Sequence, residues 1–214
     1  MIKGVIFDLD GVIVSTDELH YQGWKYMADS EGIYFDRKIN ERLRGVSRME
    51  SLDIILEKAT KTYTDTQKER LATLKNDYYR ELLSTLSPND ILAGVQEVLT
   101  GLKAAGVKIA IGSSSKNTPT ILKQIGMDTT FDAVSDGNNI TNSKPAPEVF
   151  LIAAERLGLQ PEDCLVVEDA EAGITAALAA NMKALAVGSA ATDKRAHLAA
   201  ADLSKISVEE MINL

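Results

Sequence analysis

Near its N-terminus the chain reads Gly4-Val5-Ile6-Phe7-Asp8-Leu9-Asp10-Gly11-Val12. The apolar residues before Asp8 do not alternate with polar ones, which is typical of a short strand buried on both faces. Asp8 and Asp10 stand where this strand should end, and ligands of an open parallel sheet bind at the carboxyl ends of its strands. Because two carboxylates so close together repel each other, a hard cation such as Mg²⁺ would suit them. On this stretch alone, an acidic turn that closes the strand is the competing interpretation.

The composition is that of a globular chain with an excess of acidic groups. A length of 214 residues suits one large domain, or a core domain that carries a smaller insert. The chain has 23 Lys and Arg residues against 31 Asp and Glu residues, a net charge of −8. Nucleic acid is therefore not expected as a partner, because binding to a phosphate backbone needs a basic face. A phosphorylated substrate would have to be held by a few local cations.

The sequence contains little that indicates targeting or redox chemistry. Cys164 is the only cysteine and begins the apolar run Cys164-Leu165-Val166-Val167, so we expect a buried and unreactive thiol. The first apolar run is short and meets Asp8 and Asp10, which does not fit a signal peptide. No run approaches the roughly 18 apolar residues of a membrane helix. We expect a soluble, cytoplasmic protein that binds no membrane, and a monomer, since no long apolar face requires a partner.

Residues 16–87 are expected to be helical throughout. Helices are predicted at 17–31, 36–43, 51–61 and 64–86, mainly from apolar residues that recur at helical spacing. No stretch among them has the pattern of a strand, and Ser87-Pro88-Asn89-Asp90 is a turn that ends the region. The sequence therefore predicts an all-α cap domain over 16–87, inserted into a core domain formed by 1–15 and 88–214.

From residue 91 onward, helices and strands alternate. Strands are predicted at 107–111, 131–135, 163–167 and 184–187, and the helices between or before them at 95–105, 118–125, about 148–157 and 172–180. Alternation of this kind predicts an α/β fold with a doubly wound, Rossmann-like parallel sheet that is covered on both faces.

Three polar clusters follow later strands, so the shared edge of a parallel sheet should bring them near the first carboxylate pair. The turn Ser113-Ser114-Ser115-Lys116-Asn117 combines hydroxyls with free backbone N–H groups at a helix start, a pattern suited to an anion. Lys144 could offer a point charge to a phosphate. Glu168 and Asp169 end an apolar run, and carboxylates on neighbouring strand tips suit an octahedral Mg²⁺. Taken singly, these clusters could also be polar turns and a solvated loop lysine.

Together these groups make a site for a phosphoryl group, a metal ion and a nucleophile. Asp8 can attack phosphorus and form an aspartyl phosphate. Asp10, two residues further on, can protonate the leaving oxygen and later deprotonate the attacking one. Mg²⁺, Lys144 and the serine-rich turn would neutralise charge on the transferring group.

These motifs resemble the four motifs of the haloacid dehalogenase superfamily of phosphotransferases, whose members with this pattern carry a helical cap after the first strand. The matching motifs span the whole chain and are Asp8-Leu9-Asp10-Gly11-Val12, Gly112-Ser113-Ser114, Lys144-Pro145 and Glu168-Asp169. The resemblance implies that Mg²⁺ is held by Asp8, by the backbone carbonyl of Asp10, and by Glu168 and Asp169.

Within that superfamily the cap selects the substrate, and this cap is similar to that of the β-phosphoglucomutase subfamily. The matching pieces include Arg44-Gly45-Val46-Ser47-Arg48 and Leu74-Lys75-Asn76. The resemblance implies an isomerase that converts β-D-glucose 1-phosphate to glucose 6-phosphate through β-glucose 1,6-bisphosphate. The implied substrate-binding residues are Thr16, His20, Trp24, Gly45, Val46, Arg48, Lys75, Ser113, Ser114, Ser115, Lys116, Asn117 and Lys144. Four of these would hold the second phosphate, namely Arg48, Ser115, Lys116 and Asn117.

Other functions stay open at this point. A Mg²⁺-dependent sugar-phosphate phosphatase could use the same core, but a hydrolase has less use for further cations such as Arg48 and Lys75. A phosphonoacetaldehyde hydrolase would need a cap lysine that forms a Schiff base, and the neighbours of Lys75 do not suggest one. Loss of Asp8 or Asp10 would have indicated a catalytically silent binding protein, and both residues are present.

Overall fold

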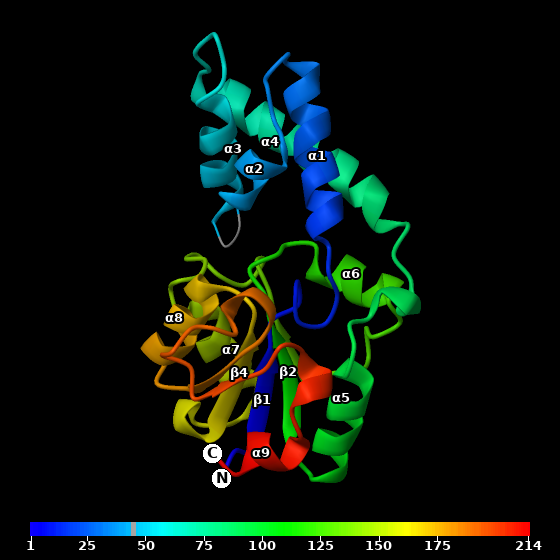
Figure 1. The fold of residues 1–214 in the computed structure, drawn as a ribbon, viewed down its shortest axis with the longest axis vertical. Coiled ribbons are helices and arrows are strands. Elements are labelled where there is room, and N and C mark those ends of the chain that lie inside the picture. The colour runs from blue at the N-terminus through cyan, green and yellow to red at the C-terminus, as the bar shows by residue number, and fades with distance from the viewer. Residues whose placement is uncertain (44–45) are drawn as a thin grey trace. The chain divides into compact units, whose positions relative to one another are not determined.

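The computed structural model describes residues 1–43 and 46–214. The chain folds into two compact units (Figure 1): Met1–Ser15 with Ser87–Leu214, here called the core, and Thr16–Leu86, here called the cap. The core is built around a six-stranded parallel sheet, and the described residues of the cap contain helices but no strand. This confirms the predicted fold class, an α/β core with an all-α cap.

The sheet has the strand order β3-β2-β1-β4-β5-β6, and every neighbouring pair is parallel. Its strands are β1 (Gly4–Phe7), β2 (Lys108–Gly112), β3 (Ala133–Ser135), β4 (Cys164–Glu168), β5 (Lys183–Ala186) and β6 (Leu198–Ala199). In the central strand, Ile6 lies opposite Ala110 of β2 and Val166 of β4. Strands β1, β2 and β3 follow one another toward one side of the sheet, and β4, β5 and β6 follow one another toward the other side. This order makes the gap between β1 and β4 the topological switch point, where such sheets bind ligands.

Helices cover both faces of the sheet, as buried parallel strands require. The helices of the core are α5 (Val95–Ala104), α6 (Thr118–Gln124), α7 (Glu148–Leu157), α8 (Glu171–Ala179) and α9 (Val208–Ile212), with short 3-10 turns at Pro88–Asp90, Pro161–Asp163, Gly188–Ala190 and Leu203–Lys205. On one face, Ile6 and Val166 share a buried cluster with Phe150 of α7 and Ile174 of α8. From the other face α5 packs against β2, and α9 packs against α5 (Figure 1).

The region after residue 187 adds structure that the sequence did not predict. The last expected strand was 184–187, but β6 pairs with β5 and extends the sheet by one strand. A strand of two residues is too short to show any periodicity, so only its pairing with Leu185 and Ala186 defines it.

The cap is organised around the contact between its first and last helices. It contains α1 (Asp17–Ser30), α2 (Arg37–Glu41), α3 (Arg48–Leu56) and α4 (Asp65–Leu83), and α1 packs against α4. At Gly23 of α1, a Cβ would lie 3.1 Å from Lys75 Cε and 3.4 Å from Tyr79 Cβ. Glycine at this position therefore lets the two helices approach closely.

Local hydrogen bonds set the start of α3. The side chains of Ser47 and Glu50 each bind the other's backbone N–H, which is a capping box. Because this box precedes the apolar residues, α3 begins at Arg48 rather than at Ser51, where apolar spacing alone had placed the start.

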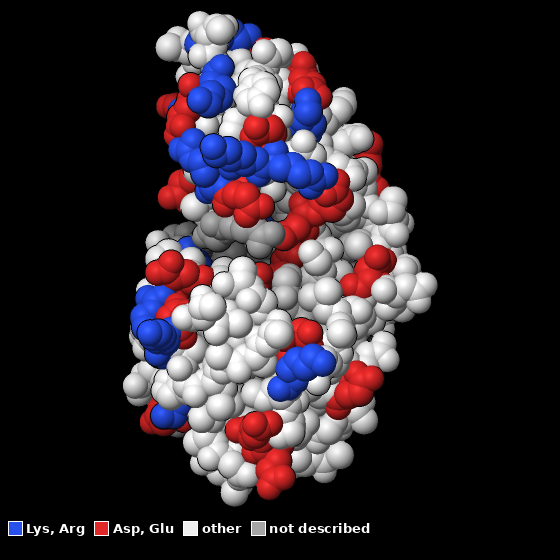
Figure 2. All heavy atoms as spheres, viewed as in Figure 1, with Lys and Arg blue, Asp and Glu red and all other residues white. Residues whose placement is uncertain are grey.

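Charged side chains cover much of the cap surface. The face in Figure 2 shows Lys and Arg gathered across the cap with Asp and Glu beside them. Several are paired, such as Arg37 with Glu18 at 2.8 Å and Arg42 with Glu57 at 2.7 Å. Exposed pairs like these contribute little stability each. Within the described ranges, the chain has no helix with the length and apolar character needed to cross a bilayer.

Candidate active site

The loop after β1 carries two carboxylates at the switch point of the sheet. The Asp8 N–H donates to the Val167 carbonyl at 2.9 Å, so the sheet hydrogen bonds continue as far as Asp8. At Gly11, φ is +86°, and a Cβ would clash with the Asp169 carboxylate. Glycine satisfies both constraints. The turn thereby admits Asp169, from the end of β4, beside the loop that bears Asp8 and Asp10.

Lys144 links the ends of β1 and β4. Its Nζ lies 2.6 Å from Asp8 Oδ1 and 2.5 Å from Glu168 Oε1, and these three side chains are 10%, 11% and 1% exposed. The ring centroid of Phe150 lies 4.7 Å from the ammonium group. Burial disfavours the charged form of Lys144, but Asp8 and Glu168 outweigh it and raise the pKa of the lysine. Burial also raises the pKa of Glu168, against the opposing effect of Lys144.

Three carboxylates at this edge suit a hard divalent cation. One oxygen from each of Asp8, Glu168 and Asp169 lies within 4.8 Å of the others. Carboxylate oxygens are the ligands that Mg²⁺ prefers in proteins. The Ala170 N–H donates to Glu168 Oε2 at 2.9 Å and so orients this carboxylate. The residues present therefore fit the expected magnesium ion, and the backbone carbonyl of Asp10 as a further ligand stays a prediction.

The serine-rich turn after β2 is ordered by its own side chains. Ser113 Oγ accepts from the Ser115 N–H, and Ser115 Oγ accepts from the Asn117 N–H, both at 3.2 Å. The prediction of free backbone N–H groups is wrong at these two positions, because hydroxyls of the turn already bind them. The turn can still offer side chains to an anion. Ser114 Oγ is buried without a hydrogen-bond partner in the described part of the chain, and Lys116 is exposed.

A second polar loop, which the sequence analysis missed, packs beside this turn. It follows β3 as Asp136-Gly137-Asn138-Asn139. The Gly137 N–H donates to the Ser115 carbonyl at 3.2 Å, and Asn138 Nδ2 donates to the Lys116 carbonyl at 3.1 Å. The loop thus supports the backbone of the turn. Its signal in the sequence was a polar run directly after a short strand.

In the cap, four of the predicted residues belong to one cluster, in which Lys75 is buried. Lys75 of α4 is 2% exposed, and its Nζ lies 2.8 Å from Nδ1 of His20 on α1. The ammonium group also lies over the rings of Trp24 and Tyr79, 5.0 and 4.4 Å from their centroids. Tyr79 OH donates to Thr16 Oγ1 at 3.1 Å. Tyr79, one helical turn after Lys75, is a member of this cluster that the sequence analysis did not single out.

The surroundings of His20 define its charge and its tautomer. Burial lowers the pKa of His20 well below its ordinary value, and the positive charges of Lys75 and Arg48 lower it further. The imidazole is therefore neutral at physiological pH. Because an ammonium group can only donate, Nδ1 accepts from Lys75 and the ring proton lies on Nε2.

Arg48 is the first residue of α3, and a side chain of α4 holds it. Its Nη2 donates to Asn76 Oδ1 at 2.8 Å. In the sequence, Asn76 stood out only as part of the motif Leu74-Lys75-Asn76, and this contact gives it a role beside Arg48. Val46 is exposed, and Gly45 lies outside the described residues.

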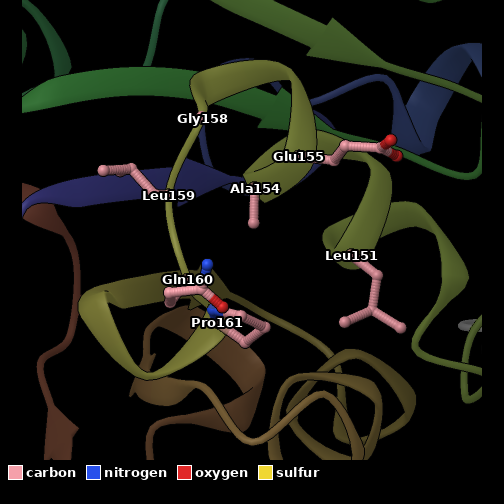
Figure 3. Close-up of a pocket in the computed structure, with 7 residues that line it drawn as sticks. All are labelled: Leu151, Ala154, Glu155, Gly158, Leu159, Gln160 and Pro161. Carbon is pink, nitrogen blue, oxygen red and sulfur yellow. The ribbon is translucent and has the colours of Figure 1, made fainter.

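A shallow pocket lies near the amino end of β4, whereas Asp8 and Glu168 lie at the carboxyl ends of their strands. It has a volume of about 450 Å³ and is lined by Leu151, Ala154, Glu155, Gly158, Leu159, Gln160 and Pro161 (Figure 3). These residues belong to α7 and to the segment that leads into the amino end of β4. Among these lining residues only Glu155 is charged. The pocket therefore offers no cation for a phosphate and no set of metal ligands.

Known proteins resemble this chain over most of its length. The sequence model of a family described as haloacid dehalogenase-like hydrolase matches residues 2–181. A beta-phosphoglucomutase of Bacillus subtilis (strain 168) is 43% identical over 210 residues, which cover 97% of this chain and 93% of the relative. The fructose-1-phosphate phosphatase YqaB of Escherichia coli (strain K12) is 33% identical, over 86% of this chain and 95% of the relative.

A solved structure extends the likeness to the fold. The crystal structure of beta-phosphoglucomutase from Clostridium difficile is 41% identical, with a TM-score of 0.91. The alignment covers 100% of this chain and 96% of that one, so it includes the helical cap as well as the sheet.

Proposed function

The chain belongs to the haloacid dehalogenase-like hydrolase family, and from this premise we propose that it interconverts β-D-glucose 1-phosphate and glucose 6-phosphate. The intermediate is β-glucose 1,6-bisphosphate, which is formed by way of a phosphoryl group on Asp8. The observation that carries the proposal is a cationic group in each unit: Lys144 in the core, and Arg48 with Lys75 in the cap. A bisphosphate that turns round between two half-reactions needs cations for both of its phosphates.

In the proposed reaction, the core supplies the nucleophile and the proton shuttle. A sugar hydroxyl attacks the phosphorus of the Asp8 aspartyl phosphate, Asp10 takes the hydroxyl proton, and the bond from Asp8 to phosphorus breaks. In the second half-reaction, Asp8 attacks the phosphorus of the phosphate that the substrate carried originally. The bond between that phosphorus and the sugar oxygen breaks, and Asp10 returns the proton to that oxygen. The 2.6 Å contact between Lys144 and Asp8 supports a role for the lysine in neutralising the transferring group.

We assign the metal site to Asp8, Glu168 and Asp169, with the backbone carbonyl of Asp10. The three carboxylates support this assignment, since one oxygen from each lies within 4.8 Å of the others. The carbonyl of Asp10 is proposed from the family resemblance. When bound, Mg²⁺ supplies positive charge against the phosphoryl oxygens. Lys144 orients Asp8, because its ammonium group contacts Asp8 and Glu168 at the same time.

In the cap, we assign Arg48 to the non-transferring phosphate, together with residues 115–117 of the core. A guanidinium group can bind phosphate through two parallel N–H donors, and the hydrogen bond to Asn76 supports a fixed orientation for it. His20 and Lys75 are assigned to sugar hydroxyls, because the Nε2–H of a neutral imidazole and an ammonium group are both donors.

A sugar-phosphate phosphatase is the second candidate, and the likeness to YqaB favours it. In that reaction water, rather than a sugar hydroxyl, attacks the aspartyl phosphate. The cations of the cap argue against it, because a monophosphate presents only one phosphate to be bound.

The experiment that separates the two supplies Mg²⁺, β-glucose 1-phosphate and a trace of glucose 1,6-bisphosphate, and follows glucose 6-phosphate and free phosphate together. We expect glucose 6-phosphate with little free phosphate, and no turnover of the α-anomer. Free phosphate that rises in step with substrate loss would replace the mutase with a phosphatase.

Two arginine variants of the cap sharpen this assay. Arg48→Ala should reduce mutase turnover far more than hydrolysis of a small acyl phosphate. Arg42→Ala removes an exposed arginine that pairs with Glu57, and it should leave both rates unchanged. Equal losses of both activities in Arg48→Ala would mean that Arg48 is a structural residue.

A further inference from the structure

Tyr79 ties the first turn of α1 to α4. Thr16 stands at the N-cap of α1, but its side chain makes no capping hydrogen bond. Its Oγ1 accepts instead from Tyr79 OH at 3.1 Å, and its carbonyl accepts from the His20 N–H at 2.9 Å. Both Thr16 and Tyr79 are fully buried. The Tyr79 phenol therefore adds a hydrogen bond from α4 to the turn of backbone that carries His20, beside the packing of α1 against α4.

The ring of Tyr79 also contacts both partners of the bond between Lys75 and His20. It stacks on the imidazole, with centroids 4.2 Å apart and an angle of 26° between the planes. The Lys75 ammonium lies 4.4 Å from the centroid of the same ring. Stacking resists tilting of the imidazole out of its plane. A half-turn of the imidazole about the Cβ–Cγ bond would replace Nδ1 by carbon and break the hydrogen bond to Lys75.

We propose that Tyr79 is the positioning residue for His20. Its ring holds the imidazole plane, and its hydroxyl holds the turn of α1 from which His20 projects. Nδ1 of His20 then stays hydrogen-bonded to Lys75, and the Nε2–H of His20 points in a single direction. This inference rests on the proposed function for its purpose, which is to present one N–H donor to a sugar hydroxyl.

The charged groups around the imidazole act on its proton, whereas the stack and the hydrogen bond of Tyr79, here called the clamp, act on its ring plane and its backbone. The cationic groups that act on His20 are Lys75 of α4 and Arg48 of α3. Two cations repel a proton on Nδ1, but they do not by themselves fix the plane of the ring. The centroid of the Trp24 ring lies 5.0 Å from the ammonium group of Lys75, whereas Tyr79 stacks on the imidazole itself.

The test is a nitrogen-15 NMR measurement of the ring of His20 in the free protein, without substrate. The chain has two histidines, so His197 of the core serves as an internal reference. In the wild type we expect one tautomer with the proton on Nε2. In Tyr79→Leu, which removes both the stack and the hydroxyl, the two ring nitrogens should move toward averaged shifts. An unchanged pair of nitrogen shifts for His20 would overturn the proposal.

Two further variants separate the parts of the clamp. Tyr79→Phe keeps the ring, so the tautomer should persist, but amide hydrogen exchange at His20 should rise about fivefold to tenfold, the equivalent of one hydrogen bond. Unchanged exchange would refute the role of the hydroxyl, and this variant also serves if Tyr79→Leu does not fold. Tyr78→Leu is the matched control, because Tyr78 stacks on Tyr26 instead and its loss should leave the His20 shifts unchanged.

An activity readout then connects the clamp to catalysis. If Tyr79 acts through His20, Tyr79→Leu should lower kcat in the wild type but cause little further loss in a His20→Ala background. Additive losses would show that Tyr79 acts independently of His20. Because the NMR measurement needs no substrate, a failure of the mutase assignment would leave the result on Tyr79 standing.

Discussion

Replacement of Lys144 by methionine should destabilise the core by an amount that depends on pH. Methionine keeps a long apolar stem but removes the charge that lies between Asp8 and Glu168, of which Glu168 is 1% exposed. Two buried carboxylates then face each other, and the least costly response is for one to bind a proton. The ordinary pKa of a glutamate is 4.5, so at pH 7 this uptake costs at most about 3.4 kcal/mol, at 1.36 kcal/mol per pH unit.

The measurement is urea unfolding of the wild type and Lys144→Met in EDTA, at pH 7 and pH 5.5. We expect a loss of about 3 kcal/mol in the free energy of unfolding at pH 7 and about 1.4 kcal/mol at pH 5.5, because protonation becomes easier as the pH falls. Saturating Mg²⁺ should restore most of the loss by returning positive charge to the carboxylates. Lys123→Met, at an exposed position of α6, should change stability by no more than about 0.5 kcal/mol.

Two results would contradict this expectation for Lys144→Met. An equal loss at both pH values would mean that Lys144→Met removes packing rather than charge. A loss below about 0.5 kcal/mol at pH 7, no greater than that of a surface substitution, would mean that Asp8 and Glu168 do not face each other in a buried site.

Four further predictions concern single residues. Asp10→Asn should keep the fold and the Mg²⁺ affinity but abolish turnover, because the proton shuttle is lost; near-normal turnover would contradict this role. Asn76→Ala should raise the KM for the bisphosphate several-fold with little change in kcat, since Arg48 loses its 2.8 Å hydrogen bond; an unchanged KM would show that this support is not needed. Asp169→Asn should weaken Mg²⁺ binding in calorimetry by roughly tenfold or more, and an equal affinity would exclude Asp169 as a ligand. The free energy of unfolding should fall as the pH drops below about 6.5, because unfolded His20 then binds a proton that the folded state disfavours. His20→Gln should flatten this slope, and identical slopes would assign it to other groups.

The position of the core carboxylates could be predicted because it depends on local patterns. A buried apolar run ends directly before Asp8, and another ends at Glu168. Strands that alternate with helices must run parallel, so their carboxyl ends meet at one edge. Residues 160 positions apart in the chain are thereby expected side by side, and the structure shows Lys144 in contact with both of these carboxylates.

In the serine-rich turn, the residue types alone did not determine which groups are available to an anion. Its composition predicted an anion site with free N–H groups, but Ser113 and Ser115 use their hydroxyls to bind two of these groups. A hydroxyl can serve the ligand or its own backbone, and the residue types are the same in both cases. The direction in which each side chain turns is set by the packing of neighbouring loops.

The apolar patterns in the sequence were enough to predict an all-α cap and an α/β core, because such a pattern is a property of each segment by itself. It could not show that Tyr79 stacks on His20 or that Asn76 binds Arg48. Those contacts join α4 to α1 and α3, and they depend on the separation and rotation of packed helices. A periodicity says which face of a helix is buried, but only tertiary packing determines which side chain of another helix lies against it.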